Sequence, residues 1–263
     1  MRDMYRKLPM VGGTPREVAE VVNNIIEGKS NNTGEITLAT GNATTTTIYN
    51  ERIGFNSIIL LTPISAAAGS DTVPYGAFQD TTDQTAASTT AAYAITFNTT
   101  DFSNGVYLSN SSRLNVRNTG LYNLEFSIQF KNTSTSSEDV EVWFRKNGTD
   151  IAASNSRFGL PARKGSGDAS HVIGALNFYV ELVAGDYVEL MWKVSATSVS
   201  IEHYAAGTSP TRPATPSVIT TMSYVSTSAS TNVYVSARSS GSATLKHFAN
   251  NTADKTYGYI IVA

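Results

Sequence analysis

The residue types that could bind a metal or act as a nucleophile are few and scattered. The three histidines, His171, His203 and His247, form no HxxxH or HExxH spacing, and the chain has no cysteine. Histidine metal sites need such closely spaced ligands. Absence of cysteine excludes disulfides, thiolate catalysis and Cys-based zinc or iron–sulfur sites. We therefore expect no metal and no cofactor.

Two arrangements of residues could still perform hydrolysis. Asp168, Ser170 and His171 have the side chains of a hydrolase triad, but triad members normally come from distant segments, and the glycines before Asp168 are typical of a loop. Two carboxylate pairs could flank a glycosidic bond, namely Glu138 with Asp139 and Glu141 with Glu189. Charges on a strand surface are the simpler interpretation of these pairs. No GxGxxG, P-loop or Gly-x-Ser-x-Gly motif is present, so we expect no catalytic residue and no enzyme.

The composition argues against two classes of binding partner, nucleic acids and membranes. Only 15% of the 263 residues are charged, the net charge is −2, and no basic stripe exists to neutralise a phosphate backbone. No apolar stretch approaches the roughly 18 residues that a membrane span requires, and the N-terminus lacks the apolar segment of a signal peptide. We expect neither nucleic-acid binding nor membrane insertion. Exposed tyrosines and loops rich in Asn and Thr make a surface glycan a candidate partner.

One segment near the N-terminus has the complete signature of a helix. Thr14 is placed as the N-cap, Pro15 at the first helical position and Glu17 as the partner in a capping box, and a glycine supplies the stop. The helix expected over 14–28 carries one apolar stripe, formed by Val18, Val21, Val22, Ile25 and Ile26. Because so short a helix is marginal alone, either the same stripe of neighbouring subunits or the chain's own β-domain must cover it. We assign these five residues to oligomerisation.

Residues 1–13 precede this helix and are expected to form an extended arm. The arm combines apolar and basic side chains and ends in Pro9 and two glycines. It is either a docking peptide that orders on a larger assembly or a frayed terminus. As a docking peptide it would anchor the protein through Arg2, Met4, Tyr5, Arg6, Lys7 and Leu8.

The rest of the chain alternates between apolar and polar residues as β-strands do. Strands are expected over 35–38, 44–47, 57–63, 232–238, 243–247 and 256–262. Two stretches of small residues, 64–71 and 226–231, are expected to be domain junctions. Between the junctions we expect a two-sheet sandwich. Two of its strands should present buried faces, formed by Tyr122, Leu124, Phe126, Ile128 and Phe130 and by Tyr187, Val188, Leu190 and Trp192.

The stretch from about Tyr75 to Val225 carries motifs of a known fold. They are Phe97, Gly120-Leu-Tyr-x-Leu-x-Phe126, Val142-Trp-Phe-Arg-Lys-Asn-Gly148 and Leu182-x-Ala-Gly-Asp-Tyr-Val-Glu-Leu190. In these motifs the stretch resembles the C1q/tumour-necrosis-factor-like jelly roll. The resemblance implies three-fold association and a role in binding or structure, although fold alone does not fix function. No acidic cluster matches the calcium site of the animal C1q proteins.

The flanking segments have hallmarks of their own: Lys29-x-Asn-Asn-Thr-Gly34, Asn56–Pro63, Tyr234–Arg238 and His247-x-x-Asn-Asn251. These resemble the two halves of a small β-domain common in phage hypothetical proteins, with the jelly roll inserted at a loop tip. The expected fold is all-β: a jelly roll over 72–226 inserted in a small β-sandwich formed by 29–71 and 227–263, preceded by the arm and one short helix.

The two resemblances together imply a bacteriophage virion protein, made in the host cytoplasm. The expected function is a trimeric tail, fibre or adhesion component that presents the jelly roll for binding to the host surface. Its partners would be two further copies of itself, other virion proteins of the tail, portal, neck or capsid, and a host-surface glycan. A capsid decoration, cement or head-fibre protein is the alternative, and a glycan-cleaving virion enzyme is a third hypothesis.

Overall fold

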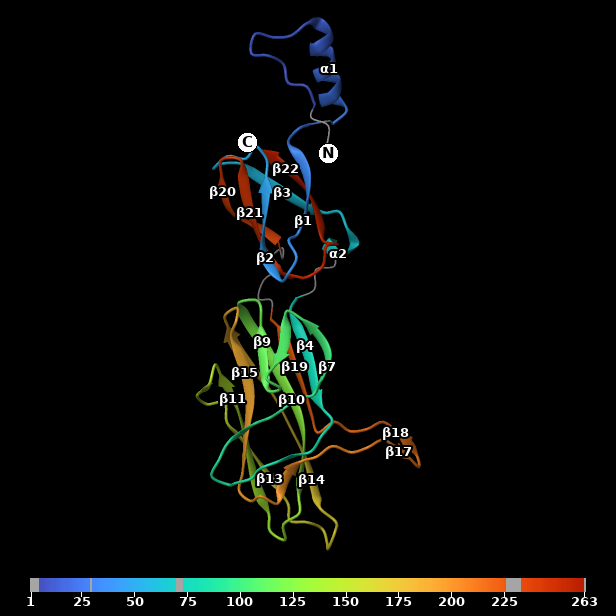
Figure 1. The fold of residues 1–263 in the computed structure, drawn as a ribbon, viewed down its shortest axis with the longest axis vertical. Helices are drawn as coiled ribbons and strands as arrows, with labels where there is room; N and C mark the ends of the chain where they lie inside the picture. The colour runs from blue at the N-terminus through green and yellow to red at the C-terminus, as the bar shows by residue number, and fades with distance from the viewer. Residues whose placement is uncertain (1–4, 29, 70–72, 226–232, 263) are drawn as a thin grey trace. The chain divides into compact units, whose positions relative to one another are not determined.

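The computed structural model describes residues 5–28, 30–69, 73–225 and 233–262. Its contacts divide the chain into two compact units, one formed by Met1–Asp71 and Ser230–Ala263 and the other by Thr72–Ala229. We call the first the outer domain and the second the inserted domain, because the second interrupts the sequence of the first (Figure 1).

The outer domain contains two three-stranded antiparallel sheets, in the orders β1-β22-β3 and β2-β21-β20. The strands are β1 (Thr33–Thr37), β2 (Ala43–Tyr49), β3 (Ile58–Pro63), β20 (Val233–Ser239), β21 (Ser242–Asn250) and β22 (Thr256–Val262). Each sheet therefore pairs strands that lie before the inserted domain with strands that lie after it. The expected pairing of 35–62 with 232–262 is present.

Two helices belong to the outer domain. Helix α1 (Pro15–Ile26) has Thr14 as its N-cap, and the capping box with Glu17 is formed in both directions. Glu27 caps its C-terminus, and Gly28 follows in the left-handed conformation, φ 71°, which glycine adopts without steric cost. The predicted caps are thus confirmed. Helix α2 (Ala66–Gly69) is a single turn.

Eight strands build the body of the inserted domain as two antiparallel sheets (Figure 1). One sheet has the order β14-β10-β19-β4, and the other has the order β13-β11-β15-β9. The strands are β4 (Tyr75–Asp80), β9 (Arg113–Val116), β10 (Gly120–Asn132), β11 (Glu138–Lys146), β13 (Ser156–Leu160), β14 (Ser170–Leu182), β15 (Tyr187–Val194) and β19 (Val218–Tyr224). This is a jelly-roll-like sandwich, and the chain as described is all-β apart from its two helices.

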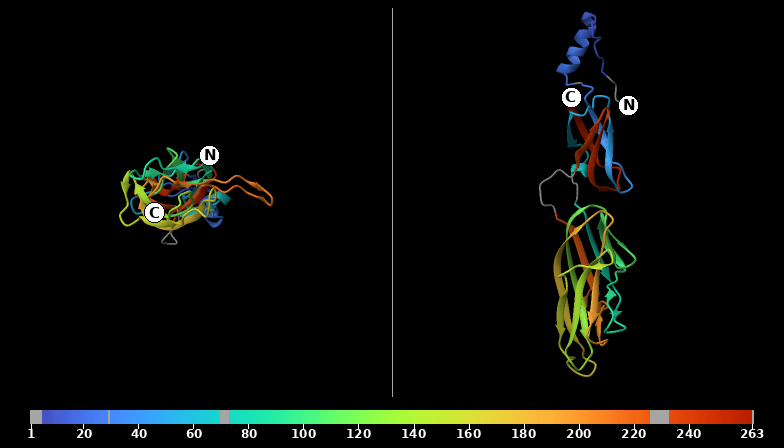
Figure 2. Two further views of the ribbon diagram at one scale, coloured as in Figure 1. Left: turned by 90° about the horizontal axis from the view of Figure 1, so that it is seen from below. Right: turned by 90° about the vertical axis from the view of Figure 1, so that its left-hand side faces the viewer.

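Short strands extend these sheets at their margins. In the first sheet β7 (Thr99–Asn104) pairs with β4, β16 (Val199–Ile201) pairs with β10, and β5 (Gln84–Thr85) pairs with β16. In the second sheet β8 (Val106–Ser109) pairs with β9, β6 (Tyr93–Ala94) with β15, and β12 (Thr149–Asp150) with β11. The hairpin of β17 (Gly207–Thr208) and β18 (Thr211–Arg212) projects from the sandwich (Figures 1 and 2).

Alternation along the strands explains the core between these sheets. All five residues of the predicted face on β10, from Tyr122 to Phe130, are buried, and Val188, Leu190 and Trp192 on β15 oppose them. Tyr187 is the exception to the expectation, because it lies one residue out of phase with Val188 and a strand changes face at every residue. Its side chain lies on the outer face of the sheet, half-buried.

The first predicted junction, 64–71, ends where the two units divide. Residues 64–69 belong to the outer domain: the backbone N–H of Ile64 donates to Thr256, Ala68 is buried, and the Ala68 carbonyl accepts from the Tyr257 hydroxyl at 3.2 Å. The small side chains allow this close packing. Residues 70–72 and the second junction, 226–231, lie outside the described residues.

Candidate functional site

The triad suggested by the sequence is not assembled. Ser170 is buried and its hydroxyl donates to the Pro161 carbonyl, whereas His171 lies on the opposite face of β14, with Nδ1 3.0 Å from the Tyr204 hydroxyl. Asp168 is exposed in a turn closed by its backbone contacts with Gly165. The serine and the histidine therefore cannot act on one another.

The other candidates for chemistry have structural partners. His247 is buried between the Thr46 hydroxyl, 2.8 Å from Nε2, and the Phe248 carbonyl, 2.7 Å from Nδ1. Hydrogen bonds from Asn155 and then Arg157 hold the pKa of Glu141 below its usual value, so this carboxyl is an anion and a poor proton donor. Within the described ranges no three His, Asp or Glu side chains are grouped so that they could hold a metal ion.

The five stripe residues lie together on α1, and the outer domain leaves four of them exposed. No residue of α1 is buried. The exposed fractions are 39% for Val18, 45% for Val22, 68% for Ile25 and 77% for Ile26, and Val21 is half-buried. Neither helix of the described chain is long and apolar enough to cross a membrane.

The described part of the arm folds back on its own domain. The Tyr5 backbone exchanges two hydrogen bonds with the Asn31 side chain, at 2.7 and 2.8 Å. Arg6 pairs with Glu17 and Glu20, and Lys7 pairs with Glu51, while Leu8 is 36% exposed. Of the six proposed anchors, Arg2 and Met4 lie outside the described residues.

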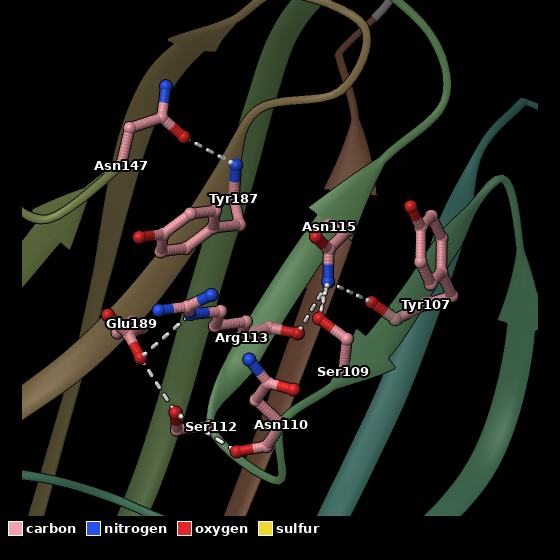
Figure 3. Close-up of polar contacts among 9 residues, drawn as sticks. All are labelled: Tyr107, Ser109, Asn110, Ser112, Arg113, Asn115, Asn147, Tyr187 and Glu189. Atoms are coloured by element: carbon pink, nitrogen blue, oxygen red, sulfur yellow. Dashed lines mark hydrogen bonds and ion pairs between the residues drawn. The ribbon is translucent and has the colours of Figure 1, made fainter.

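A surface that the sequence did not single out lies on the outer face of β8, β9 and β15 (Figure 3). Its centre is Asn115, which stands opposite Tyr107 on one side and Tyr187 on the other. The Asn115 amide donates to the Ser109 hydroxyl at 2.7 Å and to the Arg113 carbonyl at 2.9 Å. These bonds fix the middle of the surface.

Two arginines lie over the rings of the two tyrosines. The Arg113 guanidinium carbon is 4.4 Å from the centre of the Tyr187 ring, and that of Arg117 is 4.2 Å from the centre of the Tyr107 ring. This is cation–π geometry. Stacking limits the conformations of both arginines. We call Arg113, Arg117, Tyr107, Tyr187 and Asn115 the Arg/Tyr surface.

The electrostatics of the two arginines differ. Nε of Arg113 is 3.6 Å from the carboxylate of Glu189, which is buried and accepts the Ser112 hydroxyl at 2.7 Å. Arg117 has no carboxylate within ion-pair distance in the described part of the chain. An acidic or hydroxyl-rich ligand would therefore meet one partly neutralised guanidinium and one free one.

The turns beside the surface are locked to each other. Asn147, in the β11–β12 turn, accepts the Tyr187 N–H at 3.0 Å and donates to Asp186 at 2.7 Å. Asp186 also accepts the Val183 N–H at 2.8 Å and pairs with Lys146 at 2.8 Å. Two of the motifs that suggested a jelly roll, Lys146-Asn-Gly and Gly-Asp186-Tyr, thus contact one another and position Tyr187.

The sequence contained a signal for this surface. In Arg113-Leu-Asn-Val-Arg117 the apolar residues Leu114 and Val116 are buried, so the polar residues at alternate positions must share the outer face. The Tyr partners come from other strands and could not be assigned without pairing. No protein-family model and no curated protein matches the chain.

Proposed function

We propose that the protein is a non-enzymatic structural component of a bacteriophage virion, a homotrimer of the tail, fibre or adhesion apparatus that presents its inserted domain to the host surface. The sequence motifs of the two domains support this assignment. The observation that carries the binding role is the Arg/Tyr surface, which combines fixed cations, aromatic rings and amide groups without a metal or a catalytic constellation.

The ligand class that this surface suits is an anionic glycan. Guanidinium groups bind carboxylate or sulfate in a planar, bidentate way, and a hydroxyl group such as that of Tyr107 can bind sugar hydroxyls. Asn115 is buried and holds the surface together through its internal hydrogen bonds. The stacked arginines are held in place before the ligand arrives, which lowers the entropy lost on binding. Partners within the virion would be two further copies of the chain and proteins of the tail, portal, neck or capsid.

Binding to host cells tests this proposal. The double variant Arg113→Ala/Arg117→Ala should bind host cells or their acidic polysaccharide at least about tenfold more weakly than the unmodified protein, a change of about 1.4 kcal/mol. Arg157→Ala is the matched control, because Arg157 is an exposed arginine elsewhere in the same domain, 64% exposed and paired with Glu141. Equal binding by all three proteins would refute the glycan role of the surface.

Two further measurements separate the hypotheses. Cleavage of the polysaccharide, detected as new reducing ends, would contradict a binding protein and favour an enzyme. A cryo-EM reconstruction of the virion that places the chain on the tail would support attachment. Density on the capsid surface would favour the alternative, a decoration, cement or head-fibre protein.

A further inference from the structure

Besides the α1 stripe, the outer domain exposes a second apolar surface. It consists of Ile58 and Leu60 on β3 and Ile260 and Val262 on β22, which we call the sheet patch. Ile260 stands opposite Leu60 and Val262 opposite Ile58. Their exposed fractions are 57%, 55%, 45% and 50% in the order named. Four adjacent aliphatic side chains exposed on one sheet face mark an interaction site.

The surroundings extend the sheet patch. Ile64, 51% exposed, lies beside it, and Gly258 on β22 leaves a shallow groove of about 280 Å³ along Leu60 and Ile260. Neither β3 nor β22 contains a charged residue. The one carboxylate that lines the groove is Glu35 of β1, opposite Gly258, so an apolar element docked over Ile58, Leu60, Ile260 and Val262 would leave it at the edge of the contact.

The stripe on α1 has the shape of a surface that packs on a sheet. Its residues recur at i, i+3, i+4, i+7 and i+8, which gives a face about 100° wide, broader than the two-position seam of a coiled coil. The helix has 12 residues, fewer than two heptads, whereas coiled coils need about three or four. A helix bundle made of α1 alone is therefore a poor cover for the stripe.

We propose that the α1 stripe of one copy packs on the sheet patch of a second copy. The stripe from Val18 to Ile26 is about 12 Å long at 1.5 Å per residue. On β3 the patch runs from Ile58 to Leu60, about 7 Å at 3.3 Å per residue, and Ile64 continues the apolar surface beside Leu60. The charged residues of α1, Arg16, Glu17 and Glu20, lie outside the stripe at 100° per residue.

A second copy is the occupant because both surfaces belong to this chain and neither is covered within it. No residue of α1 is buried, and the four patch residues are 45–57% exposed. In a trimer each copy would bury both surfaces, its stripe against one neighbour and its patch against the other. Because each copy gives one stripe and receives another, the contact is head-to-tail and closes into a ring when the rotation permits. The proposal rests on the trimer of the proposed function and names the surfaces that join its copies.

Cross-linking tests the contact, since the chain has no cysteine of its own. One tagged chain carries Ile25→Cys and a differently tagged chain carries Leu60→Cys, and the two are co-expressed and treated with a short bis-maleimide. We expect a covalent product that contains both tags. The control pairs Ile25→Cys with Ile173→Cys, a residue of the inserted domain that is 61% exposed, and should give none.

Each other outcome overturns the contact. If the Ile25→Cys chain cross-links to itself in particles of three copies, the helices meet each other; the trimer stands and this inference fails. If the double variant Ile25→Cys/Leu60→Cys cross-links only within one chain, α1 covers its own sheet. If light scattering gives the mass of one chain at micromolar concentration, the trimer fails too, while glycan binding by the Arg/Tyr surface remains open to its own test.

A charge placed on either surface gives a second readout. Leu60→Glu and Val22→Glu should each weaken assembly by at least tenfold in concentration and leave the unfolding of the inserted domain unchanged. Tyr49→Glu, at a side chain 80% exposed on β2 in the other sheet, is the control and should assemble normally. Normal assembly by Leu60→Glu would overturn the proposal, because this substitution lies on a surface face and leaves the buried core intact.

Discussion

At the scale of single residues, Asp186 shows how a turn motif becomes a stabilising lock. Burial by itself would raise the pKa of this carboxyl. Hydrogen bonds from Lys146, the Val183 N–H group and Asn147 outweigh burial and lower the pKa to about 2. The carboxylate therefore joins two turns that are distant in sequence, and it must be charged to do so.

The low pKa sets a pH window for stability. In the unfolded chain the pKa of Asp is about 3.9, so the contribution of Asp186 is complete above that value and is lost as the pH falls through about 2. Asp186→Asn should destabilise the inserted domain by about 1 kcal/mol at pH 7, with a smaller difference at pH 2.5. Chemical denaturation at both pH values measures this. Glu125→Gln, at an exposed residue of β10, is the control, and a difference independent of pH would contradict the lock.

Gly120 is required because the ring of Tyr224 lies against it. A Cβ at this position would overlap the ring of Tyr224, which packs edge-on against Tyr122 with ring centres 5.4 Å apart. Gly120→Ala should destabilise the inserted domain by about 1–3 kcal/mol, the usual result of overpacking. Gly185→Ala tests backbone strain in place of steric overlap. A Cβ at this position would meet no other atom, but the φ of Gly185 is 94°, which an alanine adopts only with strain. An unchanged melting temperature for Gly120→Ala would show that the Tyr224 ring can move aside.

At the scale of elements, the last hallmark of the outer domain explains how its two halves hold together. The amide of Asn250 donates to the carbonyls of Leu38, Ala39 and Thr252, at 2.8 to 3.2 Å. The backbone carbonyl of Asn250 also accepts the Asn42 N–H. One buried side chain of β21 thus fixes the connection between β1 and β2, more than 200 residues earlier.

Removing this amide should affect only one domain. Asn250→Leu leaves buried carbonyls without donors, which costs about 1–3 kcal/mol, so the outer domain should unfold at lower denaturant concentration. Asn251→Leu is the matched control, because Asn251 is the exposed neighbour. Tryptophan fluorescence reports on the inserted domain, which holds both tryptophans, and should not change. A loss of both transitions together would mean that the domains are energetically coupled.

Local sequence patterns predicted the helix α1 and most of the long strands, because helix caps and strand alternation depend on residues that are close in sequence. Thr14, Glu17 and Gly28 defined α1, and alternation defined the buried face of β10. The Arg/Tyr surface could not be found this way, since Tyr107 and Tyr187 meet Asn115 only through strand pairing. The assignment of Tyr187 to the buried face was wrong. Val188, Leu190 and Trp192 occupy that face, so Tyr187, one residue before Val188, points to the other one.

At the scale of the whole molecule, the arm formed by residues 1–13 is the proposed anchor, and its removal tests that role. Its exposed ion pairs contribute little stability, typically below about 1 kcal/mol each. Deleting residues 2–12 should therefore leave the melting temperature of the purified protein nearly unchanged. Under the proposed virion role, in which the arm is the anchor, the same deletion should abolish incorporation into particles. Normal copy number in virions would place the anchor elsewhere, on the outer domain. A melting temperature lower by several degrees would instead assign the arm to the protein's own structure.

The insertion of one domain within the other also sets an order of events during synthesis. All the strands of the inserted domain leave the ribosome before β20, so this domain can fold first. β1, β2 and β3 must wait unpaired until residues 242–262 are made, because β21 and β22 are the central strands of the outer sheets. A chain that stops before β21 would have the strands of the inserted domain but neither sheet of the outer domain. Under the proposed contact between copies, only chains that extend through β22 could receive a neighbour, so the topology would act as a check on translation.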